Sequence, residues 1–180
     1  DPSGKRLEKN SVAAAQFADW RAQASSFEAI SAIRRERLNL TGDGQPERLV
    51  LHRVSASYLR ILRVYPVLGR GFLPTEDQPG NQNVIVLTHD LWQRHFGGAS
   101  DVVGRSVRLG GHSYSIIGVL PAWPPQPLEC DALAPFVLGS ESWHRSRSDH
   151  RLRVIGRLRA GVTFEAAQAE MERITLGLKP

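Results

Sequence analysis

Apolar and polar positions alternate along several stretches of this chain, and a period of two predicts β-strands. Residues 27–41 and 47–54 read as two strands joined by a turn, because Asp43-Gly44 lies in a Gly/Pro cluster between them. Residues 106–120 read as another pair of strands, which turns at Gly110-Gly111. The pattern therefore predicts two β-hairpins.

The alternation is strictest in residues 151–159, RLRVIGRLR. Leu152, Val154 and Leu158 face one way, and four arginines face the other. These arginines are Arg151, Arg153, Arg157 and Arg159. The pattern fits the solvated outer face of a half-buried strand, and it also fits a docking surface for an acidic partner or for anionic lipid headgroups.

Two amphipathic helices are predicted near the ends of the chain. Residues 11–23 place Phe17 and Trp20 on one face, and Ser11 is the predicted N-cap. Thr163 is the predicted N-cap of the last helix, whose apolar positions recur at steps of three and four residues. This stripe consists of Phe164, Ala167, Met171, Ile174 and Leu178.

The middle of the chain adds shorter elements. Residues 84–88, VIVLT, suit a buried strand, and residues 89–96 suit a short helix that ends at Gly97-Gly98. Residues 121–131, PAWPPQPLECD, form a proline-rich connector that resists both helix and sheet. Trp123 in this connector is a candidate exposed anchor for a protein partner. Helices and strands mixed along the chain predict an α+β fold.

Residues 54–77, VSASYLRILRVYPVLGRGFLPTED, place glycines and an arginine after a predicted helix. A phosphate-binding loop needs its glycines before a helix, so that free amides point at the anion. Gly69-Arg70-Gly71 lies on the wrong side of the helix for this role. We therefore predict a corner between two structural layers, in which Arg70 bonds helix-end carbonyls or a carboxylate such as Glu76 or Asp77.

The composition indicates a globular chain. Of 180 residues, 41% are hydrophobic and 23% are charged, which is typical of a folded rather than a disordered protein. The net charge is +5, carried by 20 arginines and three lysines. Genome composition also produces such a skew, so the charge gives little support to nucleic-acid binding. No run of about 18 apolar residues and no signal peptide is visible, and the start at Asp1 suggests an excised piece of a larger protein.

No motif of a catalytic or metal site stands out. The nucleotide loops GxGxxG and GxxxxGKS/T, the nucleophile elbow GxSxG and the zinc motifs HExxH and CxxC are absent. The six histidines include no pair at the i, i+4 spacing of a helical zinc site, and His89-Asp90 is expected at a helix N-terminus. Cys130, the single cysteine, has no local signature of a nucleophile. We therefore predict no catalytic, metal-binding or cofactor-binding residue.

Six segments, taken in order, carry a resemblance to a known family. They are FADWRAQASSFEAI, NLTGDGQPERL, VSASYLRILRVYPVLGRGFLPTED, VIVLTHDLWQRHFGG, VVGRSVRLGGHSYSIIGVLP and RVIGRLRAGVTFEAAQAEME. Together they resemble the periplasmic core domain of MacB-type, FtsX-like ABC transporter permeases, and the duplicated orphan permeases most closely. The resemblance covers residues 11–178. Two local departures are Arg63, which stands where glycine is expected, and the first helix, which lacks the usual aromatic-proline entry.

The resemblance implies an α+β fold with two lobes. A porter-like α+β lobe would consist of residues 1–79 and 136–180, and an inserted β-rich lobe would consist of residues 80–135. The domain would lie between the first and second membrane spans of a permease, on the periplasmic side of a bacterial inner membrane.

The resemblance also implies a function without catalysis in this domain. The domain would couple ATP hydrolysis in a cytoplasmic ATPase subunit or domain to periplasmic work or export, by mechanical transmission in a permease dimer or pseudo-dimer. Its implied partners are a periplasmic adaptor, a carrier protein or an activator of a cell-wall hydrolase. A different class of function, a ligand-binding or enzymatic α+β domain unrelated to transport, stays open because folds are reused. Nucleic acid is not an expected partner.

Overall fold

The computed structural model describes residues 11–41, 46–122, 129–139 and 141–177. Within these ranges, nine strands form one hydrogen-bonded sheet in the order β1-β9-β2-β3-β8-β5-β7-β4, and β6 pairs with both β2 and β7. The strands are β1 (Val12–Ala13), β2 (Phe27–Thr41), β3 (Glu47–Val54), β4 (Leu68–Gly69), β5 (Val84–Leu87), β6 (Ser106–Leu109), β7 (His112–Val119), β8 (Ala132–Pro135) and β9 (His150–Leu158). The helices are α1 (Ala14–Gln23), α2 (Tyr58–Leu62), α3 (His89–Phe96) and α4 (Phe164–Gly177), with a 3-10 turn η1 (Ser142–Arg145). The predicted α+β class is confirmed.

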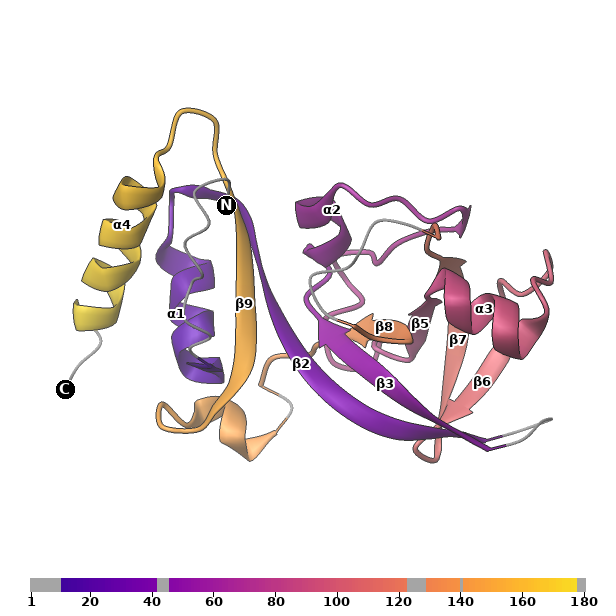
Figure 1. Cartoon of the computed structure of the whole chain (residues 1–180). Coiled ribbons are helices and arrows are strands. Elements are labelled where there is room, and N and C mark those ends of the chain that lie inside the picture. The colour runs from indigo at the N-terminus through magenta and orange to yellow at the C-terminus, as the bar shows by residue number, and fades with distance from the viewer. Residues whose placement is uncertain (1–10, 42–45, 123–128, 140, 178–180) are drawn as a thin grey trace.

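Strand β2 connects two parts of the molecule (Figure 1). One part holds α1, α4 and β9, the other holds α2, α3 and β5 to β8, and β2 runs from the first into the second. β2 pairs antiparallel with β9 along its first half and with β3 along its second half. The predicted strands at 27–41, 47–54 and 151–159 are confirmed, whereas the predicted turn at Asp43-Gly44 lies outside the described residues.

The even-numbered residues of β2 share one face of the sheet, because side chains alternate along a strand. Ala32 packs in a core with Phe17 of α1, and Leu40 belongs to a second core that includes a residue of α3. Between these two cores the same face carries Arg34 and Glu36. Charged residues therefore lie on this face where one core ends and the next begins.

The odd-numbered residues of β2 face the other way. Ile33 packs with Val54 and with Tyr58 of α2 in a third core. After Ile33 this face of β2 is open to solvent, and Arg35 and Arg37 on it are exposed. This face is therefore apolar next to α2 and basic farther along the hairpin.

Helix α1 begins later than predicted. The N-cap predicted at Ser11 is wrong, because Ala13 precedes the helix and no side chain caps it. Val12 and Ala13 form β1 instead, and they pair with Leu152 and His150 of β9. The backbone of residues 12–13 forms hydrogen bonds with β9, so the helix starts only after these residues.

Helix α4 follows the prediction more closely. The Thr163 hydroxyl accepts a hydrogen bond from the backbone N–H of Ala166 (3.2 Å), which confirms the N-cap. Ala167 and Ile174 of the predicted stripe are buried, but Phe164 is 51% exposed. Leu178 of the stripe lies outside the described residues. The helix thus contacts α1 over a narrow stripe.

Residues 54–77 form the predicted corner. After α2, the chain adds β4 to the edge of the sheet, where it pairs with β7. The Arg70 guanidinium donates two hydrogen bonds to the Glu76 carboxylate (2.9 and 2.7 Å), so one of the two predicted carboxylate partners is confirmed. Glu76 also accepts a hydrogen bond from the backbone N–H of Leu73 (2.7 Å). Both charges therefore stabilise the corner.

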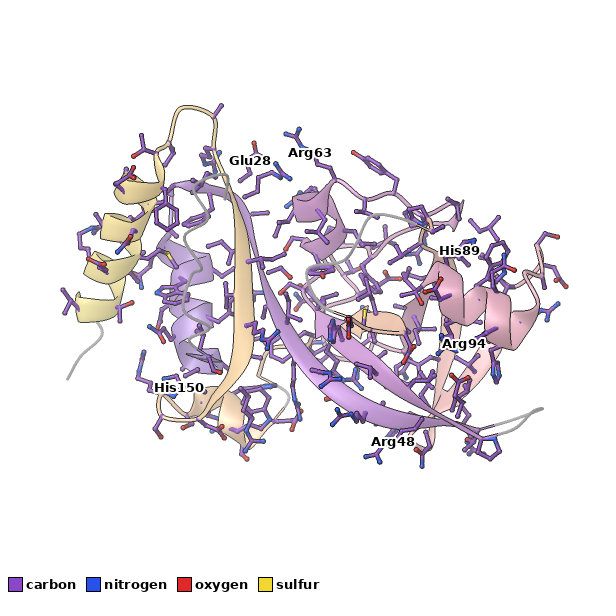
Figure 2. All side chains as sticks on the ribbon, viewed as in Figure 1. Glu28, Arg48, Arg63, His89, Arg94 and His150 are labelled. Carbon is purple, nitrogen blue, oxygen red and sulfur yellow. The ribbon has the colours of Figure 1, made fainter. Side chains whose placement is uncertain are left out.

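Arg63 ends α2 in the left-handed region, with φ at 55°. Its side chain points out from the molecule beside this helix (Figure 2). A residue with a Cβ is strained in this conformation, and glycine is not. This geometry is the physical reason why glycine is expected at position 63.

The shorter predicted elements are also present. β5 and α3 occupy 84–88 and 89–96 nearly as predicted, and Gly97 ends the helix in the left-handed region. β6 and β7 form the hairpin that turns at Gly110-Gly111. β8, which was not predicted, follows the proline-rich connector and pairs with β3 and β5. The division of the chain into lobes at 79/80 and 135/136 stays a prediction.

Candidate interaction surfaces

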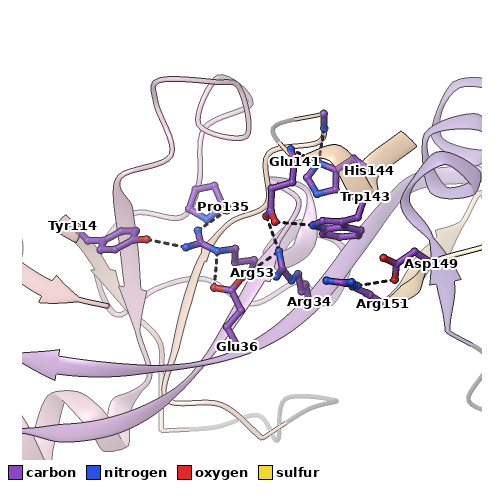
Figure 3. A network of polar contacts seen from close by, with 11 residues as sticks. Arg34, Glu36, Arg53, Tyr114, Pro135, Glu141, Trp143, His144, Asp149 and Arg151 are labelled. Atoms are coloured by element: carbon purple, nitrogen blue, oxygen red, sulfur yellow. Dashed lines mark hydrogen bonds and ion pairs between the residues drawn. The ribbon is translucent and has the colours of Figure 1, made fainter. Parts of the chain in front are cut away.

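A chain of polar contacts crosses the sheet between two of its cores (Figure 3). The Arg53 guanidinium donates hydrogen bonds to Tyr114 Oη (2.8 Å) and to Glu36 Oε2 (2.9 Å). Glu36 Oε1 lies 3.4 Å from Arg34 Nη1. The side chains of Arg34, Glu36 and Arg53 are only 17% to 20% exposed. These charges are therefore mostly shielded from water, which strengthens their interaction.

Turn η1 extends the chain of contacts toward β9. Glu141 Oε1 accepts a hydrogen bond from Arg34 (2.8 Å), and Glu141 Oε2 accepts one from Trp143 Nε1 (2.7 Å). The guanidinium carbons of Arg34 and Arg151 lie 4.9 and 5.3 Å from the centre of the Trp143 ring, within reach of a cation–π contact. We call these residues the arginine–tryptophan network. It consists of Arg34, Glu36, Arg53, Tyr114, Glu141, Trp143 and Arg151.

His144 holds η1 in place beside this network. Its Nδ1 accepts hydrogen bonds from the backbone N–H groups of Gly139 (2.9 Å) and Glu141 (3.2 Å). An Nδ1 that accepts carries no proton, and burial lowers the pKa of His144, so the ring is neutral. The neutral ring orders the turn that presents Glu141 and Trp143.

A cleft of about 630 Å³ separates the α1–β2 corner from the loop after β4. Arg21 and Glu28 line one side, and Asp77 lines the other. Arg21 Nη1 lies 3.8 Å from Asp77 Oδ2 across the cleft. The two parts of the molecule thus make a weak ionic contact here, in contrast to the network on the opposite face of β2.

The four arginines predicted to share one face of β9 have different partners. Arg151 donates to Asp149 (2.6 Å), and Arg159 donates to the carbonyl oxygen of Ser25 (2.9 Å). Arg157 Nε donates to the carbonyl oxygen of Ile61 in α2 (2.7 Å). Arg153 is exposed, and no partner is found for it among the described residues. A role of this face in partner contact stays a prediction, as does that of Trp123, which lies outside the described residues.

The groups considered for chemistry occupy structural positions. Burial raises the pKa of Cys130 to about 12, so its thiol is protonated at neutral pH and is a poor nucleophile. His89 is the first residue of α3, whose N-cap is Thr88, in agreement with the sequence. In the described ranges, no three His, Cys, Asp or Glu residues are placed to hold a metal ion together.

Glu170 ties α4 to the corner between α1 and β2. Its carboxylate accepts hydrogen bonds from the Ser25 hydroxyl (2.6 Å), the Ser25 N–H (2.8 Å) and the Ser26 N–H (2.9 Å). These bonds, the Ser25 hydroxyl first, lower the pKa of Glu170 to about 2. A carboxylate whose pKa is lowered by folding stabilises the protein above its unfolded pKa and loses this effect as the pH falls.

We expect Glu170→Gln to lower the free energy of unfolding by about 1 kcal/mol at neutral pH, less than the full pKa shift implies because the site is open to solvent. The difference from wild type should vanish as the pH falls from about 4.3 toward about 2, since wild-type Glu170 is then protonated as well. Urea unfolding at several pH values measures this. Glu172→Gln is the matched control on the same helix, because within the described ranges the Glu172 carboxylate accepts from Gln168 alone (2.9 Å). A loss that persists unchanged at acid pH would contradict the assignment.

No helix in the described part of the chain is long and apolar enough to span a membrane. No curated protein matches this sequence. Among solved structures, the chain is similar to the extracellular domain of the noncanonic ABC-type transporter YknZ from Gram-positive bacteria, with a TM-score of 0.69 and 15% identity over 96% of this chain and 88% of that one. It is also similar to the periplasmic region of MacB from Actinobacillus actinomycetemcomitans, with a TM-score of 0.71 and 14% identity over 98% of this chain and 78% of that one.

At these low identities, the two structures show only that the fold is shared. The family is shown by a match of the sequence itself. Residues 3–174 match the family described as the MacB-like periplasmic core domain. The match spans nearly all of the chain, and the two similar structures are an extracellular domain and a periplasmic region. The nearer relation to the duplicated orphan permeases stays a prediction. The chain belongs to the MacB-like periplasmic core domain family.

Proposed function

We propose that this domain is the non-catalytic, extracytoplasmic part of an ABC transporter permease and that it couples cytoplasmic ATP hydrolysis to work outside the membrane. The observation that carries the proposal is the contact between α1 and α4. Gln16 Nε2 and Trp20 Nε1 both donate to Thr175 Oγ1 (3.2 and 3.1 Å). The first turns of α1 therefore lie beside the last turn of α4 (Figure 1), as is suitable for a domain joined to two neighbouring membrane spans.

Strand β2 is the proposed route from these helices to the rest of the domain. It starts next to α1, continues for 15 residues and takes part in all three cores. An element packed into several cores moves with them, so a displacement of α1 and α4 is passed on to the far part. The arginine–tryptophan network adds a second link between the same two parts.

The proposal includes partners outside this chain. A cytoplasmic ATPase subunit or domain drives the movement through the membrane spans, and a second permease copy completes a dimer or pseudo-dimer. A periplasmic adaptor or carrier protein receives the movement on the outer side. This arrangement places the domain on the periplasmic side of a bacterial inner membrane.

The parent gene tests the placement, and the parent permease tests the coupling. Apolar segments of about 20 residues on both sides of the domain are expected; polar flanks on both sides would remove the proposal. Spin labels at exposed Glu165 in α4 and exposed His112, the first residue of β7, then report the distance between the two parts. We expect the distance to shift when ATP is added to the permease with its ATPase, and not with a hydrolysis-deficient ATPase. Identical distance distributions with the active and with the hydrolysis-deficient ATPase would reject mechanical coupling.

A further inference from the structure

The outer face of the β2–β3 hairpin carries three arginines in addition to those of β9 that the sequence pattern indicated. Arg35 and Arg37 project from this face of β2, and Arg48 projects from β3. Arg153 of β9 lies on the same face, because it is paired with Ile33 and opposite residues of antiparallel strands share a face. All four side chains are exposed, and Figure 2 shows Arg48 pointing away from the hairpin. We call them the hairpin arginines.

The register of the strands places the hairpin arginines in a line. Arg153 is opposite position 33 of β2, Arg35 and Arg37 follow, and Arg48 is opposite position 39. Each step is two residues, or about 7 Å along the strand, so the line extends about 20 Å and follows the twist of the hairpin. The array is therefore regular and longer than a contact with one small anion requires.

The charges in this line are not neutralised within the described part of the chain. No carboxylate there forms an ion pair with any hairpin arginine, whereas eight other arginines do have one. Asp131, which is near His52, is occupied by Arg94 (2.7 Å) and by the N–H of Val50 (2.7 Å). The face thus keeps a net positive charge that an acidic partner would complement.

The pKa of the buried His52 side chain is sensitive to this positive charge. It lies directly opposite Arg35 in the sheet and is 1% exposed. Burial, and then the charges of Arg35 and Arg153, lower its pKa to about 4. Its neutral ring is the expected state at neutral pH. An acidic molecule on the face would offset the field and raise this pKa.

We propose that the hairpin arginines form a docking surface for an extended acidic segment of a partner protein. Acidic side chains at alternate positions of an extended chain repeat about every 7 Å, which matches the spacing of the arginines. The six large apolar side chains exposed in the described ranges all lie elsewhere, so the face lacks anchors for a lipid surface and aromatic platforms for bases. The surface goes beyond the coupling role, which does not depend on it.

Binding of defined probes to the 180-residue chain tests the proposal. The probes are a short peptide of alternating Glu and Thr, oligo(dT), and vesicles of phosphatidylglycerol and phosphatidylcholine in equal parts. We expect the peptide to bind best. Replacing the hairpin arginines together (Arg35→Gln, Arg37→Gln, Arg48→Gln and Arg153→Gln) should weaken binding about tenfold or more. The control set has the same change in charge at exposed positions elsewhere: Arg60→Gln, Arg105→Gln, Arg145→Gln and Arg173→Gln.

A second readout does not depend on affinity. The nuclear magnetic resonance titration of His52 should shift to higher pH in Arg35→Gln, because the change removes positive charge near the ring. Equal loss of binding in the control set would show a general charge effect and overturn the proposal. Tighter binding of oligo(dT) or of the vesicles would also overturn it.

Discussion

Gly118→Ala should destabilise the domain by about 3 kcal/mol, although the change adds only one methyl group. A Cβ at this position would lie 2.3 Å from the carbonyl oxygen of Arg70. This oxygen belongs to the backbone that follows β4 and cannot rotate away as a side chain can. The corner at 67–70 is held against β7 by the hydrogen bonds from Val67 N to Val119 O and from Arg70 N to Ile117 O, both 2.8 Å. The added methyl group must therefore separate β4 from β7.

Gly111→Ala is the matched control for this result. Gly111 has φ at 86°, but a Cβ there meets no atom within 4 Å. Its substitution should cost about 1 kcal/mol from backbone strain alone. Chemical unfolding of both variants measures the difference. Replacing glycine with alanine also restricts the unfolded chain, and this favours folding by about 0.4–1 kcal/mol. The loss of stability expected for Gly118→Ala is the value that remains after this gain is subtracted. Equal stability of the two variants would show that β4 and β7 are not in close contact.

Elements governed by local spacing could be predicted from the sequence. The strand at 151–159, the helix at 89–96 and the Gly110-Gly111 hairpin each have their pattern and their stop signal within a few neighbouring residues. The pairing of Arg70 with Glu76 was also predictable, because they are six positions apart in a tight corner. The family resemblance supplied the expectation of glycine at 63, whose left-handed backbone the structure explains.

Features that depend on distant partners could not be predicted in this way. β8 has four residues, ends in proline and lacks β-branched side chains, so its strand conformation comes from pairing with β3 and β5. Pairing of Val12 and Ala13 with β9 likewise displaced the N-cap predicted at Ser11. In both cases tertiary hydrogen bonds overrode the local signal.

One feature of the sequence indicates the arginine–tryptophan network. Along β2, charged Arg34 and Glu36 interrupt a face that is apolar on both sides of them, with Ala32 before them and Leu38 after them. Two opposite charges two residues apart on one face indicate a polar junction between apolar cores. The partners on β3, β7 and η1 are up to about a hundred residues away, so spacing alone did not identify them.

Glu36→Gln should destabilise the domain by about 2 kcal/mol and loosen the connection between its two parts. Glutamine keeps the shape of glutamate but removes the negative charge that lies between Arg34 and Arg53. Removing one member of a fully buried ion pair costs about 3–5 kcal/mol, and the 17% to 20% exposure of these side chains reduces that value. Urea unfolding measures the loss.

Asp101→Asn is the control for this variant, because Asp101 also pairs with an arginine but its side chain is 73% exposed. The free energy of unfolding should then change much less than in Glu36→Gln, because water and salt screen an exposed ion pair. Glu36→Gln is also expected to change the movement of the domain, because Glu36 lies on β2 between two hydrophobic cores. In the parent permease, Glu36→Gln should broaden the distance distribution between labels at Glu165 and His112, because the ionic connection from Arg34 to Arg53 would then be interrupted. A loss of stability with an unchanged distribution would show that the network stabilises each part but does not hold them together. Transmission would then depend on β2 and on contacts such as that between Arg157 and Ile61.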